Sequence, residues 1–194
     1  MKTKKIEINT SVFKIFPKLE GKRLFFRRMN LSYAKDIHQI RSNDDVMKFM
    51  DVTRTKSVND AKRLIRNVRE DYKNEKGVSW AVIHKNSKRF IGYAGFWRMQ
   101  PQHCRGEIGY ALKPEYWGKG FMTETLKTII DFGFHKMNLH SIEANVNPKN
   151  QKSKKLLKSL GFRKEAYFRE NYLFEGKFLD SEIYSLLKKD LSRD

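Results

Sequence analysis

A turn with two glycines, placed between a strand and a helix, is the most informative chemical feature of the sequence. Gly118-Lys-Gly120 follows an expected strand at 106–112 and precedes a segment whose apolar residues repeat at helical spacing. The first N–H groups of a helix have no partner within it, and the helix dipole adds positive potential there. With Lys119 adding charge, such a turn suits a phosphate group. A plain tight turn is the alternative, because neither the P-loop nor the dinucleotide-binding pattern is matched.

A second segment places a serine in the first turn of a helix. Asn147-Pro148 follows an expected strand at 141–146, and the next helix begins at Asn150 and ends before Gly161, a residue favoured just after helices. The Ser153 hydroxyl, together with the helix dipole, would stabilise a thiolate or another anion. An ordinary helix cap is the alternative interpretation.

Strands and helices must hold these segments in place. The spacing predicts strands at 23–29, 79–84, 90–99, 106–112, 141–146, 166–174 and 180–187, and helices at 36–41, 46–50, 58–72, 121–137 and 150–160. Antiparallel hairpins followed by a strand–helix–strand crossover predict an α/β (α+β) fold, in which a mixed sheet has helices on its faces. Residues 1–20 are expected to form an N-terminal extension, and residues 21–194 a single domain.

The composition describes a folded chain of about one domain. Its 194 residues include 39% hydrophobic and 13% aromatic residues, which excludes a disordered or fibrous protein. No apolar run approaches the ~20 residues of a transmembrane helix, and the N-terminus does not have the pattern of a secretory signal. The single cysteine, Cys104, cannot form an internal disulfide, which favours the reducing cytoplasm.

The charge balance is strongly basic, with 41 Lys and Arg against 22 Asp and Glu, a formal net charge of +19. This charge attracts polyanions, so a non-enzymatic RNA-binding module is one candidate function. The basic residues are spread along the chain, however, and a compositional bias explains them equally well. The five histidines form no metal-binding pattern, so no metal is expected.

Taken together, these segments resemble the GNAT N-acetyltransferase superfamily, specifically its ribosomal-protein N-acetyltransferase (RimJ/RimL-like) branch. The likeness extends over residues 20–190 and rests on Gly109-Tyr-Ala-Leu-Lys-Pro-Glu-Tyr-Trp-Gly-Lys-Gly120, Asn147-Pro-Lys-Asn-Gln-Lys-Ser153, Leu160-Gly-Phe162 and Gly176-Lys-Phe-Leu-Asp180. It implies a GNAT-like, mostly antiparallel central sheet with helices on both faces. It also implies acetyl-CoA as co-substrate, without a metal.

The resemblance places the pyrophosphate loop of the family on 117–122, where Trp117 replaces a Gln or Arg and Met122 replaces a small residue. It implies that residues 110–112 line the pantetheine arm through their backbone and that Asn150 hydrogen-bonds the same arm. The implied cofactor-binding residues are Tyr110, Ala111, Leu112, Trp117, Gly118, Lys119, Gly120, Phe121, Met122, Thr123 and Asn150.

The implied catalytic residues are Glu107 and Ser153, because this chain has Leu157 and Asn145 where other relatives carry a catalytic Tyr and Glu. Glu107 would take the proton of the amine through a water molecule, and Ser153 would assist the leaving thiolate. A polar strand position is the alternative for Glu107. Glu107 shares a strand face with Gly109, whose missing side chain is expected to leave room for the acceptor.

The resemblance implies acetyl transfer to a primary amine, without a covalent enzyme intermediate. The acceptor is either the N-terminal amine of a protein, such as a ribosomal protein, or a small molecule such as a polyamine, amino sugar, amino acid or aminoglycoside. The expected protein is a cytoplasmic monomer or homodimer with no membrane partner, and its basic surface leaves association with the ribosome open.

Overall fold

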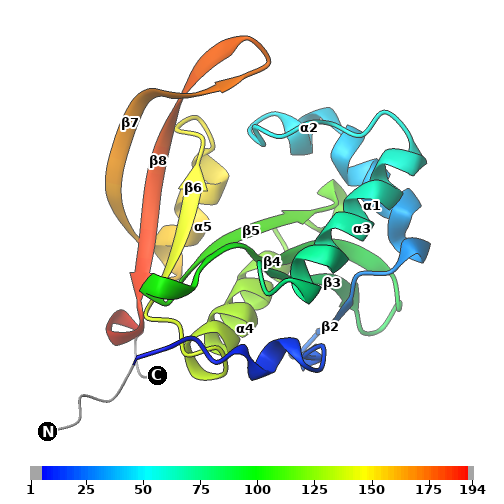
Figure 1. The fold of residues 1–194 in the computed structure, drawn as a ribbon. Helices are drawn as coiled ribbons and strands as arrows, with labels where there is room; N and C mark the ends of the chain where they lie inside the picture. The colour runs from blue at the N-terminus through cyan, green and yellow to red at the C-terminus, as the bar shows by residue number, and fades with distance from the viewer. Residues whose placement is uncertain (1–5, 192–194) are drawn as a thin grey trace, which may run out of the picture.

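The computed structural model describes residues 6–191, so the first five residues of the predicted extension and the last three of the predicted domain lie outside it. Within this range, eight strands form one sheet and five α-helices pack around it (Figure 1). The strands are β1 (Leu19–Glu20), β2 (Leu24–Arg28), β3 (Val78–His84), β4 (Phe90–Gln100), β5 (Arg105–Leu112), β6 (Ser141–Val146), β7 (Arg163–Phe174) and β8 (Lys177–Leu187). The helices are α1 (Ala34–Ser42), α2 (Asp44–Met47), α3 (Val58–Lys73), α4 (Phe121–His135) and α5 (Gln151–Ser159).

The strands follow the spatial order β1-β2-β3-β4-β5-β6-β8-β7. Neighbours are antiparallel except for β5 and β6, which are parallel and are joined through α4. This arrangement confirms the predicted mixed, mostly antiparallel sheet. A parallel pair needs a long crossover connection, and α4 provides it.

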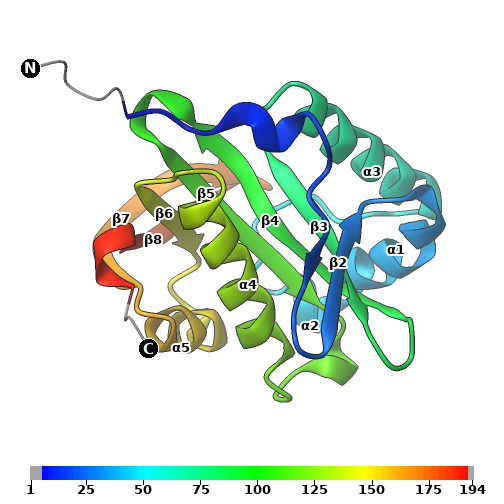
Figure 2. The same cartoon turned by 90° about the horizontal axis from the view of Figure 1, so that it is seen from below.

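Helices cover both faces of the sheet, and the alternation of side chains along each strand supplies a core to each layer. On β3, Trp80 and Val82 belong to the core beneath α4, whereas Ala81 and Ile83 belong to the core beneath α1 and α3. Figure 2 shows α4 lying across one face, with α1 and α3 beyond the opposite face.

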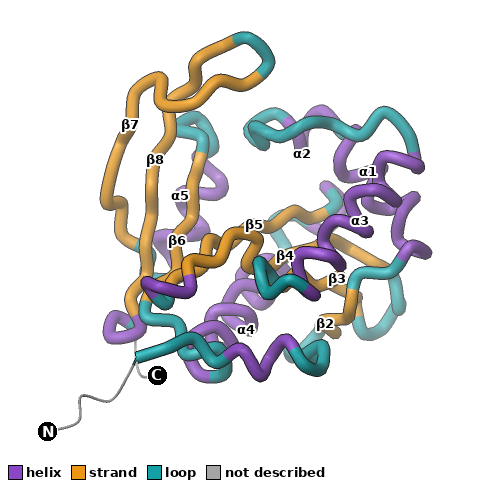
Figure 3. The backbone as a smooth tube through the Cα atoms, in the orientation of Figure 1, coloured by secondary structure: helices purple, strands orange, loops and turns teal. Residues whose placement is uncertain are grey.

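β5 and β6 pair over only three positions before they separate. Residues 105–107 of β5 lie opposite residues 141–143 of β6, and no pairing follows. β5 continues beside β4 to Leu112, while β6 continues beside β8 to Val146. Figure 3 shows the two strands diverging; we call the region between residues 108–112 and residues 144–146 the β5–β6 fork.

The segment before β2 packs against the domain. Ile8 and Phe13 are buried, and the Asn9 N–H donates to the Met137 carbonyl, which lies just beyond α4, at 2.9 Å. The Trp80 indole N–H donates to the Pro17 carbonyl at 2.7 Å. Residues 6–20 therefore contribute to the core beneath α4.

Gly133 allows α4 to approach β4 closely, since a Cβ there would lie 2.6 Å from Cζ of the fully buried Phe96. Overpacking costs about 1–3 kcal/mol, which exceeds the ~0.5–1 kcal/mol that alanine gains over glycine in a helix. We expect Gly133→Ala to lower the melting temperature by about 2–6 °C. Asn67→Ala, at an exposed position of α3, is the control and should cause no decrease. An unchanged or higher melting temperature for Gly133→Ala would contradict this packing.

Candidate functional site

The edge of β5 that borders the fork carries unpaired backbone groups. The Lys113 N–H donates to the Ile91 carbonyl at 2.9 Å, which fixes the residues of β5 that bond to β4. Because bonding directions alternate along a strand, Ile108 and Tyr110 direct their N–H and C=O groups toward the fork. These groups form a polar edge to which an extended, amide-containing chain can bind.

The turn beyond β5 is shaped by its glycines. Gly118 and Gly120 have φ values of +70° and +74°, a region that favours glycine. Gly120 caps α4 without a side-chain hydrogen bond. A Cβ on Gly118 would meet nothing within 4 Å, and a Cβ on Gly120 would meet only the Arg23 guanidinium, at 3.5 Å. The first N–H groups of α4 therefore open onto space that an anion can enter.

Arg23, which was not predicted as a site residue, holds this turn. Its Nε pairs with Glu124 at 2.7 Å, and its Nη1 donates to the Lys119 carbonyl at 3.0 Å. The Lys119 ammonium folds back onto the Glu115 carbonyl at 2.8 Å, rather than extending beyond the turn. Arg23 and Glu124 are 101 positions apart, so no local pattern indicated their contact.

The predicted cofactor-binding residues lie on adjoining segments. Residues 110–112 end β5, residues 117–120 form the turn, and residues 121–123 begin α4. The Trp117 indole N–H donates to the Leu112 carbonyl at 3.0 Å, which joins the turn to the strand. The Lys152 ammonium lies 4.7 Å from the centre of the Trp117 ring, so α5 begins beside the same turn.

Asn150 caps α5 by accepting from the Ser153 N–H, so the Ser153 hydroxyl takes no part in the cap. The Asn150 side chain accepts a hydrogen bond from the Ser153 N–H at 3.0 Å, so this carbonyl group is used by the helix. The Ser153 hydroxyl instead meets the Tyr110 hydroxyl at 2.6 Å. Burial raises the pKa of Tyr110 to about 12, although the contact with Ser153 opposes this. The sequence indicated only the backbone of Tyr110, because its partner lies 43 positions away.

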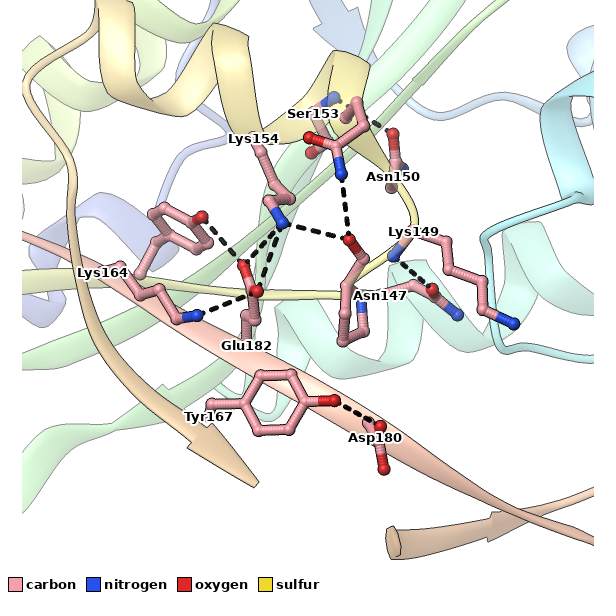
Figure 4. A network of polar contacts seen from close by, with 12 residues as sticks. Asn147, Lys149, Asn150, Ser153, Lys154, Lys164, Tyr167, Asp180 and Glu182 are labelled. Carbon is pink, nitrogen blue, oxygen red and sulfur yellow. Dashed lines mark hydrogen bonds and ion pairs between the residues drawn. The ribbon is translucent and has the colours of Figure 1, made fainter. Parts of the chain in front are cut away.

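A buried carboxylate fixes α5 against the sheet (Figure 4). Glu182 on β8 pairs with Lys154 of α5 at 3.2 Å and with Lys164 of β7 at 2.9 Å. Burial opposes its ionisation, yet hydrogen bonds from Lys164, Tyr184 and Lys154 hold the pKa of Glu182 below its usual value. Lys154 also donates to the Pro148 carbonyl at 3.0 Å, which positions the loop that leads into α5.

Glu107 lies on the other face of β5, so the structure does not bring the two predicted catalytic residues together. Tyr110 packs in the core beneath α4 and α5, whereas Ala111, which shares a face with Glu107, packs beneath α1 and α3. Glu107 is 6% exposed and pairs with Arg98 at 3.2 Å. Burial and the neighbouring Glu143 raise the pKa of Glu107, while Arg98 and the Trp97 indole act in the opposite direction.

The space above Gly109 is filled, contrary to the expectation that it would receive the acceptor. A Cβ on Gly109 would lie 3.2 Å from Cδ1 of the Trp97 indole. A shift in the β4–β5 register between Phe96 and Arg98 places Trp97 over the neighbouring strand. Trp97 is 48% exposed, so an acceptor approaching Glu107 meets this indole.

A hydrogen-bonded bridge connects the two sides of the fork at its far end. Asp51, which follows α2, accepts hydrogen bonds from the Tyr172 hydroxyl of β7 and from the Asn147 amide at 3.1 Å. Burial and the contact with Asp51 raise the pKa of Tyr172, which keeps the hydroxyl protonated as the donor. Arg41 of α1 holds the same loop through the Thr53 carbonyl at 2.9 Å.

Other features lie outside this region. A hollow of about 490 Å³ between α1 and the β3–β4 turn is lined by Asp36, Lys88 and Lys113 among others, and by none of the predicted site residues. Across residues 6–191, no group of three or more His, Cys, Asp or Glu side chains is placed to hold a metal ion. In the same range, no helix has the length and apolar character needed to cross a membrane.

Comparisons with known proteins agree with this geometry. The family model described as an acetyltransferase (GNAT) domain matches residues 23–163. The uncharacterized N-acetyltransferase p20 of Bacillus licheniformis is 36% identical over 172 residues, which cover 89% of this chain and 97% of p20. The ribosomal protein uS5-alanine N-acetyltransferase of Escherichia coli (strain K12) is 30% identical over 128 residues, covering 63% of this chain and 64% of that enzyme.

The fold is also found in a solved structure. RimJ of Mycobacterium smegmatis, in complex with CoA-disulfide, superposes with a TM-score of 0.79 at 20% identity, over 88% of this chain and 85% of that one. The chain therefore belongs to the GNAT acetyltransferase family and is an N-acetyltransferase, with relatives that include a ribosomal-protein N-acetyltransferase.

Proposed function

We propose that this N-acetyltransferase transfers the acetyl group of acetyl-CoA to the N-terminal amine of a protein. The observation that carries the proposal is the β5–β6 fork, which begins at Glu107 and opens beside the glycine turn at the start of α4. The free edge of β5 supplies hydrogen-bonding groups for an extended pantetheine arm. The turn supplies helix N–H groups for the phosphates.

The residues of the turn fit coenzyme A. Gly118 and Gly120 leave room where a phosphate would approach, and Arg23 and Lys152 add positive charge beside it. Tyr110, Ala111 and Leu112 would align the arm, while residues 117–123 would hold the pyrophosphate. Asn150 contributes by capping α5, in addition to any contact with the arm that its amide makes.

The residue that accepts the proton of the amine and the residue that assists the leaving group lie on opposite sides of β5. An attacking amine must be neutral, so Glu107 accepts its proton through a water molecule. A backbone N–H on the fork edge of β5 stabilises the oxygen of the thioester carbonyl. When acetyl-CoA donates its acetyl group to the amine, the C–S bond breaks and coenzyme A leaves as a thiolate, which the Ser153 hydroxyl stabilises. Tyr110 orients that hydroxyl through their 2.6 Å contact.

The acceptor class rests on two supports. The Escherichia coli relative is named as an alanine N-acetyltransferase of a ribosomal protein, and the only amine that an alanine residue can offer is the α-amine at a chain terminus. The Asp51 bridge spans the fork, so an acceptor reaches Glu107 beneath it or displaces it, which favours a chain end over a bulky surface. Small-molecule amines are the second candidate, and they meet the same steric requirement.

The setting of the reaction follows from the charge and the cysteine content. We place the enzyme in the cytoplasm, as a monomer or homodimer, with Cys104 as a buried free thiol. Its net charge of +19 suits an acceptor presented beside RNA, as on a ribosome. If the chain were instead an RNA-binding module, it would bind RNA with strong salt dependence and show no affinity for acetyl-CoA.

An acceptor screen tests the proposed function. Release of free thiol from acetyl-CoA is followed with peptides that carry a free N-terminus and with polyamines, amino sugars, amino acids and aminoglycosides. We expect kcat/KM for the best free-terminus peptide to exceed that of every small amine by about tenfold or more. The same peptide with a blocked N-terminus is the matched control and should be inert. Faster reaction with a small amine would support the second candidate instead.

Binding of acetyl-CoA is tested with two matched glycine variants. Gly120 and Gly176 have φ values of +74° and +76°, so valine strains both turns similarly, but only Gly120 borders α4. A hundredfold excess of acetyl-CoA over its Kd stabilises the native chain by about 2.7 kcal/mol, or roughly 5–11 °C in melting temperature. We expect this shift in the unmodified chain and in Gly176→Val, and its loss in Gly120→Val.

Two results would contradict the cofactor assignment. The absence of any shift in the unmodified chain at millimolar acetyl-CoA would reject acetyl-CoA as the co-substrate. A full rise in melting temperature with acetyl-CoA in Gly120→Val would show that the phosphates of the co-substrate do not bind at this turn.

The role of the serine is tested by comparing two residues of α5. We expect Ser153→Ala to lower kcat by about 10²–10⁴-fold, with little change in KM for acetyl-CoA, because the hydroxyl acts on the leaving thiolate. Ser159→Ala is the control, since its hydroxyl donates to the Leu156 carbonyl at the other end of α5. A kcat for Ser153→Ala close to that of the control would reduce Ser153 to a helix-cap residue.

A further inference from the structure

Two carboxylates lie side by side where the fork begins. Glu107 on β5 and Glu143 on β6 are register partners in the last paired position before the strands separate. Like charges placed directly opposite each other destabilise a sheet unless other groups compensate. Arg98 pairs with Glu107 at 3.2 Å, and Arg105 pairs with Glu143 at 3.1 Å.

The two carboxylates are more shielded from water than the two arginines that pair with them. The side chains of Glu107 and Glu143 are 7% and 17% exposed, whereas those of Arg98 and Arg105 are 58% and 36% exposed. The arginines thus reach the carboxylates from the solvent side. Charges act more strongly on one another when they are shielded from water. In keeping with this, burial and Glu143 raise the pKa of Glu107.

The ion-pair partners of the two carboxylates come from β4 and β5. Arg98 lies on β4, Arg105 on β5 and Glu143 on β6. On β8, Ser185 is the register partner of Glu143, and its hydroxyl donates to Glu165 of β7 at 2.6 Å. The Nε of Arg105 donates to the Ser141 hydroxyl at 3.3 Å, which orients its guanidinium toward Glu143.

We propose that Glu143 and Arg105 are positioning residues of acetyl transfer that set the pH range in which Glu107 acts as the proton acceptor. The proposal rests on the proposed function, in which Glu107 is the base. Neither residue needs to touch the acceptor. Glu143 acts through its charge beside Glu107, and Arg105 limits that effect by neutralising Glu143.

Glu143 and Arg105 have opposite electrostatic effects on Glu107, so the proposal predicts opposite pH shifts for their variants. Removing the negative charge of Glu143 lowers the pKa of Glu107, so the base is ionised at lower pH. Removing the positive charge of Arg105 leaves Glu143 uncompensated and raises the pKa of Glu107. A residue with a purely structural role would reduce activity at all pH values without moving the profile.

The experiment measures kcat/KM for the acceptor against pH, at saturating acetyl-CoA. We expect Glu143→Gln to move the acidic limb to lower pH by about 0.5–1.5 units and Arg105→Gln to move it to higher pH by a similar amount. Glu165→Gln is the matched control, because the same kind of carboxylate is lost on β7, three strands away from β5. It should leave the limb in place.

Glu107→Gln separates failure of this inference from failure of the proposed function. If Glu107→Gln keeps both the kcat/KM and the acidic limb of the unmodified chain, Glu107 is not the base and the proposed function loses that step. If Glu107→Gln lowers kcat/KM and leaves only the limb of the acceptor amine itself, but the limb stays fixed in both Glu143→Gln and Arg105→Gln, the base stands and the inference is overturned. A shift of both variants in the same direction would also overturn it.

A second measurement covers variants that turn over poorly. The Glu107 carboxyl is titrated by NMR in protein labelled with ¹³C at glutamate side chains, and its signal is assigned by its absence in Glu107→Gln. We expect a lower titration midpoint in Glu143→Gln and a higher one in Arg105→Gln. Equal midpoints in folded variants, as judged by melting curves, would reject the electrostatic role.

Discussion

The rest of the site depends on the end of β5–β6 pairing after three positions. Backbone N–H and C=O groups in a protein interior require partners, and those of Ile108 and Tyr110 have none on β6. After Glu143, β6 continues beside β8 and separates from β5, so its edge toward β5 no longer lies within pairing reach. The fork therefore leaves a polar edge of β5 open within the sheet. An extended chain with amide groups can hydrogen-bond to this edge in the way that a neighbouring strand would.

The same separation brings two helix N-termini to one side of the sheet. α4 starts after the turn that leaves β5, and α5 starts after the loop that leaves β6. The contact between Trp117 and Lys152 joins these starts, and the Glu182 network holds α5 from beneath. Both helix dipoles thus favour negative charge beside the fork, where a cofactor with phosphates and a departing thiolate would place it.

Local patterns in the sequence predicted the elements well, and tertiary contacts account for what it missed. The strand at 141–146 has its predicted bounds, because alternating burial and the following Asn147-Pro148 mark it clearly. The pairing of Tyr110 with Ser153, the support of the turn by Arg23, and the bridge from Asp51 to Tyr172 all join distant positions. No spacing along a single chain indicates such contacts. The two-residue strand β1 is too short for a periodic signal.

The expectation about Gly109 shows how an inference from one strand can fail. Glycine does leave its own strand face empty, but the register shift in β4 moves Trp97 over that face. The indole then hydrogen-bonds to Glu107 and lowers its pKa, against the opposite effects of burial and of Glu143. A bulge on one strand thereby affects the protonation of a carboxyl group on the next. Such a coupling follows from the register of the sheet, which no single segment encodes.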